Sequence, residues 1–261
     1  MSYNPDRINI HELTVEEPEK LAELPFNQER DVTQNYWQWI KDKLQDYRQN
    51  KDWIGFTSLA QIIKILNPMI EFDLSEDEWQ GMKQQLKNYY EPHKIGAWEN
   101  FSTKAMQMKI IDPSHDLGLD ESTWQTMKEC LKSHRENKLW GSFAVQAAKI
   151  KIIDPTQDLS LDQTAWTGMK DELEKHRRGN YWYSFSEIAM SMRILNPNVD
   201  LALDGAAWRG MRESSPLDIS KSTMKILAAK KVEVTEKGLE ITMPELELGT
   251  KKQTLPKTKQ F

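Results

Sequence analysis

Positively charged side chains recur at one position along the chain and are its most prominent candidate for a chemical function. Lys64, Lys109, Lys151 and Arg193 each stand four residues before a proline. A second series of cations has the same period: Lys41, Lys83, Lys128, Lys170 and Arg212. Repeated cations beside aromatic residues are typical of repeat proteins that bind one nucleotide per unit. The first four residues are therefore the candidate site for RNA or another polyanion.

Acidic residues recur at the same period and favour a different interpretation of these cations. They are Glu71, Asp116, Asp158 and Asp200. In this interpretation each cation pairs with an acid and closes the loop after the proline, which leaves little net electric field. The formal net charge of −5 also provides no bulk attraction to nucleic acid. We therefore favour pairing over polyanion binding and keep the latter as the alternative.

Cysteine and histidine give little indication of catalysis. Cys130 is the only cysteine and falls in a helical segment, so we expect an inert thiol. His134 and His176 occupy equivalent positions of two repeats, where earlier repeats carry Tyr47 and Tyr89. Because tyrosine could not replace a metal-ligating histidine so freely, we expect a role in packing or at a helix end.

Sequence motifs for catalysis or cofactor binding are absent. The chain lacks GxxxxGK, GxGxxG, GxSxG and HExxH. The acidic loop DPSHDLGLD lacks the spacing and the bidentate glutamate of a calcium-binding EF-hand. We therefore predict no catalytic residue, no cofactor, no metal and no enzymatic activity. An enzyme whose site is assembled across several repeats is the third alternative.

A sixteen-residue stretch that begins at Trp53, Trp98, Trp140 and Trp182 positions the cations of the first series. Each copy carries Phe three residues after Trp, Ala four residues later, and Asn or Asp before a closing Pro: WIGFTSLAQIIKILNP, WENFSTKAMQMKIIDP, WGSFAVQAAKIKIIDP and WYSFSEIAMSMRILNP. Proline cannot continue a helix, so this stretch predicts a helix that ends just before it. We call these the A helices.

A second helix, called B, alternates with each A helix. Its buried stripe reads Trp37, Ile40 and Leu44 in the first copy, the next three copies carry Trp, Met and Leu at the same spacing, and the fifth stops short after Trp208 and Met211. Four residues before each B-helix Trp stands a good N-cap residue: Thr33, Ser75, Asp120, Asp162 or Asp204. Glycine two residues after that Trp, at Gly81, Gly168 and Gly210, predicts that a bulky neighbour approaches closely there.

These patterns predict an all-α fold, an α-solenoid of helix-turn-helix repeats of about 42 residues with roughly nine repeat helices. We expect a polar, poorly ordered arm over 1–30, the helical repeat domain over 31–216, a capping helix and a β-hairpin over 217–248, and a basic disordered tail over 249–261. The A helices carry small, variable residues and the B helices charged ones. A helices should therefore form the inner layer and B helices the outer one.

The spacing of Trp, Phe, Ala and Pro is similar to that of the tetratricopeptide repeat. The unit of 42 residues, instead of 34, and the second Trp depart from that family, so no family is assigned. Helical-repeat proteins display a curved surface for partners, which favours a scaffold that binds an unidentified protein or peptide through the variable face of the A helices. No membrane-spanning run or secretory signal is present, and one cysteine suits a reducing compartment, so we expect a cytoplasmic protein.

Overall fold

The computed structural model describes residues 30–89, 95–214 and 217–244. The predicted tail, and all but the last residue of the predicted arm, lie outside these ranges. The elements, in chain order, are α2 (Arg30–Gln49), α3 (Trp53–Leu66), α4 (Glu76–Asn88), α5 (Ile95–Ile111), α6 (Glu121–Glu136), α7 (Trp140–Ile153), α8 (Gln163–Arg178), α9 (Trp182–Leu195), α10 (Gly205–Ser214), α11 (Leu217–Ala228), β1 (Lys231–Thr235) and β2 (Gly238–Thr242).

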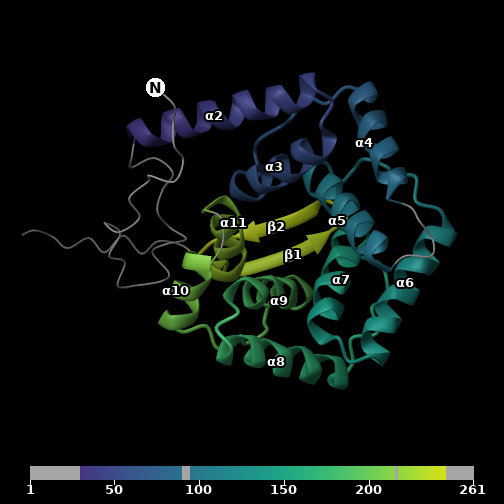
Figure 1. The fold of residues 1–261 in the computed structure, drawn as a ribbon, viewed down its shortest axis with the longest axis vertical. Helices are drawn as coiled ribbons and strands as arrows, with labels where there is room; N and C mark the ends of the chain where they lie inside the picture. The colour runs from purple at the N-terminus through teal and green to yellow at the C-terminus, as the bar shows by residue number, and fades with distance from the viewer. Residues whose placement is uncertain (1–29, 90–94, 215–216, 245–261) are drawn as a thin grey trace, which may run out of the picture.

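The helices form two layers, which confirms the predicted helical repeat. The A helices α3, α5, α7 and α9 each contact the next along the inner layer, and the B helices lie outside them (Figure 1). The buried faces of the inner helices consist mostly of apolar side chains, and Phe56, Phe143 and Phe185 are almost inaccessible to solvent. The outer helices bury one narrower stripe and expose their charged side. Each repeat therefore completes its core against its neighbours.

The ends of the helices follow the predicted local signals in most repeats. Ser75, Asp120 and Asp162 cap their helices, and Ser75 forms a capping box with Glu78. Two boundaries differ from the prediction. Helix α2 begins at Arg30, so Thr33 lies inside it and is not its N-cap, and α5 begins at Ile95, three residues before its Trp.

The turn from each B helix into the next A helix has a recurring backbone conformation. Lys51, Lys138 and Asn180 adopt positive φ of 55–56°. At Lys138 the backbone N–H groups of two successive residues reach back, from Lys138 to the carbonyl of Arg135 and from Leu139 to that of His134. This is a Schellman motif, which ends a helix by satisfying its last carbonyl groups. The turn therefore fixes the orientation of the B helix relative to the A helix that follows it.

The solenoid curves far enough to close into a ring. Helix α11 packs against both α9 and α3, and Lys225 Nζ donates a hydrogen bond to the carbonyl oxygen of Leu66 at the end of α3 (2.9 Å). The segment Met224–Leu227 (MKIL) matches the end of an A helix, Ile63–Leu66 (IKIL), at three of four positions. Helix α11 therefore serves as a fifth inner helix.

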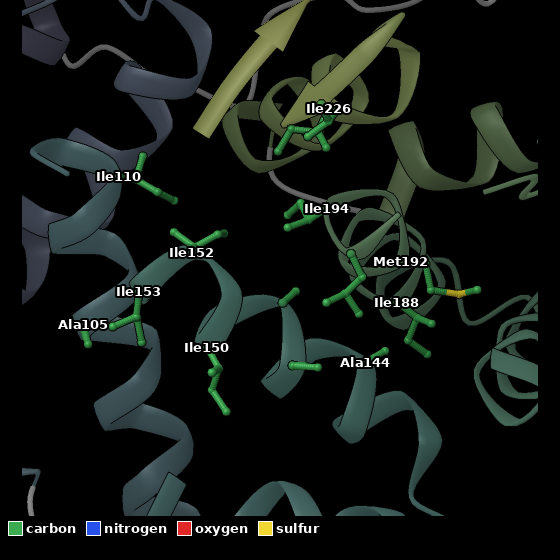
Figure 2. Close-up of a cluster of buried hydrophobic side chains, with 14 of the residues drawn as sticks. Ala105, Ile110, Ala144, Ile150, Ile152, Ile153, Ile188, Met192, Ile194 and Ile226 are labelled. Carbon is green, nitrogen blue, oxygen red and sulfur yellow. The ribbon is translucent and has the colours of Figure 1, made fainter. Parts of the chain in front are cut away.

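The C-terminal β-hairpin lies across the middle of this ring (Figure 1). Its strands pair antiparallel, with Thr235 opposite Gly238 around a two-residue turn, and contact α5, α7 and α9. Figure 2 shows one isoleucine from each of four inner helices facing the same central space: Ile110, Ile152, Ile194 and Ile226. All four are buried, as is Val232 of β1. The hairpin thus docks on its own chain.

Candidate functional site

The four cations predicted as a polyanion site lie at the C-terminal ends of the A helices. Lys64 Nζ donates to the carbonyl oxygen of Ile70 (2.7 Å), and Lys109 Nζ donates to those of Pro113 and His115 (both 2.9 Å). Arg193 donates to the carbonyl oxygen of Ala229 (2.6 Å). Lys151 occupies the same place in the last turn of α7 and is half-buried.

The repeated acids have a local role instead of pairing with these cations. Asp116, Asp158 and Asp200 each accept a hydrogen bond from the backbone N–H two residues later, at 2.8–2.9 Å. Such turns fix the loop ahead of the next N-cap. Lys64 and Lys109 therefore bind the loop that follows their own helix, through carbonyl oxygens and not through the repeated acids, whereas Arg193 binds the end of α11.

Cys130 and His134 lie together in α6, inside the protein. Cys130 Sγ is 3.5 Å from His134 Nε2, and the same nitrogen is 3.6 Å from Glu99 Oε1. Burial, followed by the charge of Glu99, raises the pKa of the Cys130 thiol, and burial lowers the pKa of His134. A thiol with a raised pKa stays protonated near neutral pH and is a poor nucleophile. This pair therefore suits packing.

A pocket of about 430 Å³ opens where α7 and α9 begin. Val145 and Lys149 line it and precede Ile152 by seven and three residues, so they share its inward face. The pocket thus lies at the end of the ring away from the hairpin. We call it the charged pocket because its lining includes Glu99, Lys138, Lys149, Glu172, Lys175, His176 and Glu187.

Lys149 is the most deeply placed cation of the charged pocket. Its Nζ donates one long hydrogen bond, to the carbonyl oxygen of Glu99 (3.4 Å). Burial lowers the pKa of Lys149, although Glu99 and Glu187 oppose that shift. Burial also raises the pKa of Glu187, which Tyr183 and Lys149 oppose. In both groups burial disfavours the charged form, and ionisable groups with such shifted pKa values are common at functional sites.

The three carboxylates of the charged pocket have partners in the chain. Glu172 lies 3.0 Å from Lys175 Nζ and 3.2 Å from His176 Nε2. Glu99 lies beside His134, and Glu187 is hydrogen-bonded by Tyr183.

The hydrogen-bond donors of the pocket are less well satisfied. Gln146 is 1 % exposed, and its Oε1 accepts from Ser102 Oγ (2.9 Å). Within the described residues its Nε2 has no hydrogen-bond partner. At the start of α7, Leu139 provides no side-chain cap for the first-turn N–H groups, whereas Asp52 caps α3.

Three exposed large side chains lie next to the charged pocket. Leu139, Tyr181 and Tyr183 are 52 %, 64 % and 45 % exposed. Leu139 lines the pocket, the ring of Tyr181 meets that of the pocket residue His176 edge-on, and Tyr183 binds Glu187. We call these three residues the rim. Large exposed aromatic and aliphatic groups around a polar centre are typical of binding surfaces.

The variable positions of the A helices separate into two groups. Thr57, Ser102, Ala144 and Ser186 are buried, and Thr57 and Ser102 bond Gln107 and Gln146 of the next A helix. Ser142, Val145 and Ser184 line the charged pocket. Only part of the predicted variable face is therefore available to a partner.

Sequence reasoning missed Lys149, Gln146 and Glu187 because each departs from its repeat. The residues matching Lys149 are Ile62, Gln107 and Ser191, and those matching Glu187 are Ser58, Thr103 and Val145. A search for charges that occur in one repeat alone would have found both.

Two further properties concern the described residues. They contain no group of three or more His, Cys, Asp or Glu side chains placed to hold a metal ion. In the same part of the chain, no helix has the length and apolar composition needed to span a bilayer.

Comparison with protein-family models, with curated proteins and with solved structures finds no significant match to this chain.

Proposed function

We propose that this protein is a non-enzymatic scaffold that binds a peptide segment of a partner protein at the end of the ring where α7 and α9 begin. The observation that carries the proposal is the rim of Leu139, Tyr181 and Tyr183 around the charged pocket. Rigid tyrosine side chains contribute contact area at a low cost in conformational entropy. The pocket beneath them offers polar groups that select the partner.

The helical ring supports such a role because it holds the rim on rigid elements. Leu139 and Tyr181 stand at equivalent positions, each just before the Trp that starts an A helix, and each follows a residue with positive φ in a Schellman turn. Binding groups placed on such a preformed frame lose little entropy when a partner docks.

The alternative, binding of RNA or another polyanion, has weaker support. Lys64, Lys109 and Arg193 donate to backbone carbonyl oxygens of loops and of the residue after α11, so these cations already have partners within the chain. The proposed setting is the cytoplasm, because the one cysteine, Cys130, is a buried free thiol.

The proposal is tested by selecting peptides from a random display library against the full chain and measuring their affinity for variants. We expect selected peptides to lose at least about tenfold in affinity for Leu139→Ser/Tyr181→Ser, since buried aromatic anchors contribute most of the binding energy. Met69→Ser is the matched control, because Met69 is 86 % exposed but follows the opposite end of α3.

Circular dichroism and thermal melting show whether the double variant keeps its fold. If no peptide is enriched, or if enriched peptides bind the double variant as tightly as the parent chain, the proposal is wrong. Peptides that lose affinity for Met69→Ser instead would place the binding surface elsewhere.

A further inference from the structure

The groups of the charged pocket that lack partners are predominantly hydrogen-bond donors. Lys149 has three N–H donors and, among the residues that the structure describes, makes one hydrogen bond, at 3.4 Å. Gln146 Nε2 is buried without a partner among the described residues. The backbone N–H groups of Gly141 and Ser142, in the uncapped first turn of α7, belong to the same lining.

Two of the three carboxylates of the pocket accept hydrogen bonds from side chains of the same chain. Glu172 is bound by Lys175 and His176, Glu187 by Tyr183, and Glu99 lies against His134. A cationic ligand would compete with these internal partners, whereas an acceptor would find donors that are free. His176 Nδ1 also lacks a partner among the described residues and becomes a donor when the ring is protonated.

We propose that the charged pocket binds a carboxylate group of the partner peptide, held by Lys149, Gln146 and the first-turn N–H groups of α7. This inference rests on the proposed function. A buried donor left without an acceptor is unfavourable, so a ligand oxygen that satisfies Gln146 removes that penalty. The N-terminus of a helix also attracts negative charge through its dipole.

The charge of the lining selects a carboxylate over a phosphate group. Three lysines of the lining, Lys138, Lys149 and Lys175, are matched in number by three glutamates. A phosphate carries about −1.5 to −2 charges at neutral pH and would face those glutamates, whereas a carboxylate carries one. Two sources of the group fit the pocket, which are the C-terminal carboxylate of a chain and the side chain of Asp or Glu.

The probes are N-acetyl-triglycine with a free carboxylate, the same peptide as its C-terminal amide, N-acetyl-Gly-Asp-Gly amide, and inorganic phosphate at matched ionic strength. Binding is followed by NMR through the backbone N–H signals of Gly141 and Ser142 and the side-chain amide signal of Gln146. We expect saturable binding of at least one carboxylate peptide, about tenfold or more tighter than the amide. Which carboxylate peptide binds identifies the source.

Substitutions then assign the roles of the two side chains. Lys149→Met and Gln146→Glu should each weaken carboxylate binding by about tenfold or more, the first by removing a charged donor and the second by replacing a donor with an acceptor. Lys170→Met is the matched control, because Lys170 is exposed on α8 and does not line the pocket. Lys149→Met should melt at the same or a higher temperature than the parent chain, since it removes a buried charge, and a purely structural lysine would not show this combination.

Several outcomes would overturn the inference. They are equal binding of amide and carboxylate, tighter binding of phosphate, undiminished binding to Lys149→Met and Gln146→Glu, or no localised shift with any probe. If either variant fails to fold, the comparison of the carboxylate, amide and phosphate probes on the parent chain decides. Display-selected peptides that need the rim but keep their affinity after amidation and for Lys149→Met would refute the carboxylate site and leave the proposed function intact.

Discussion

Glycine in three outer helices makes room for a tryptophan of the inner layer. A Cβ atom added to Gly81, Gly168 or Gly210 would lie 2.2–2.4 Å from an atom of the indole of Trp53, Trp140 or Trp182. The predicted close approach of a bulky group is therefore confirmed, and the group is a side chain. Each of these contacts joins an A helix to the B helix that follows it, and the missing Cβ of the glycine leaves room for the indole.

Substitution of Gly168 tests this contact. Gly168→Ala should destabilise the protein by about 1–3 kcal/mol because the rigid indole must shift, although alanine favours the helix by about 1 kcal/mol. The measurement is the free energy of unfolding in urea. Gly205→Ala is the control, since a Cβ there meets nothing within 4 Å and should leave stability unchanged or slightly higher. An equal response of the two variants would contradict the close packing.

Lys104 is a half-buried lysine whose hydrogen bonds join α5 to α3. Its Nζ donates to the carbonyl oxygen of Ile54 (3.2 Å), to Ser58 Oγ (2.9 Å) and, within α5, to Gln107 Oε1 (2.8 Å). Burial lowers the pKa of Lys104 to about 8, opposed by the charge of Asp52. Burial therefore disfavours the charged form of Lys104, although this side chain is hydrogen-bonded to both helices.

The lowered pKa of Lys104 makes the stability depend on pH in a defined direction. Between pH 8 and 10.5 the unfolded chain keeps the proton that the folded chain releases, so rising pH favours folding. Relative to Lys104→Met, the parent chain should gain on the order of 1 kcal/mol across this window, after discounting for partial exposure. Chemical denaturation at several pH values measures the gain, with Lys170→Met as the control for loss of one charge. A constant or falling difference would contradict the shift.

At the scale of the elements, an arginine at the end of an outer helix holds the loop of the following repeat. Arg135 donates to the carbonyl oxygen of Ser160 (2.8 Å) and to the N-cap residue Asp162, and Arg177 makes the same contacts with Ala202 and Asp204. Ser160 and Ala202 have positive φ. The arginine therefore binds the loop at its strained residue and at the cap of the next helix.

Removal of one such arginine should weaken the contact between repeats. Arg135→Met should lower the melting temperature, because two charge-assisted hydrogen bonds to the following repeat disappear. Arg178→Met should change stability by less than about 0.5 kcal/mol, since Arg178 is 78 % exposed and pairs, among the described residues, with Glu174 on its own helix. Thermal melting compares the two, and similar losses would show that the loop does not depend on Arg135.

Closure is the main property of the whole molecule. An open solenoid would leave the central isoleucines of the inner helices exposed to water. Here α11 bridges α9 and α3, and the hairpin covers Ile110, Ile152, Ile194 and Ile226. The hairpin also leaves the opposite end of the ring, with the charged pocket, open to a partner.

A charge placed under the hairpin should open the ring. Val232→Asp puts a carboxylate at a fully buried position of β1, so we expect a loss of several kcal/mol and a larger radius of gyration in small-angle X-ray scattering. Lys237→Asp introduces the same residue into the exposed turn and should change neither quantity. If Val232→Asp keeps the compact size of the parent chain, closure does not depend on the hairpin.

The sequence by itself determined the features that arise from short-range interactions. Proline ends the A helices, Ser75, Asp120 and Asp162 start B helices, and the repeat of Trp, Phe and Ala specifies the inner layer. The prediction of Thr33 as an N-cap was wrong because a helix extends past a possible cap when the residues before it also favour helix. The helical spacing also predicted more burial of the B-helix tryptophans than the structure shows. Trp79 is buried, but Trp124, Trp166 and Trp208 are half-buried.

The closure of the ring and the charged pocket are seen only in the tertiary structure. The contact of Lys225 with Leu66 joins residues 159 positions apart, and no local pattern specifies how far a solenoid curves. The unsatisfied donor of Gln146 depends in the same way on what α5, α8 and α9 place around it. Repeated residues are constrained by the scaffold and so are visible in the sequence, whereas the candidate site consists of residues that differ between repeats.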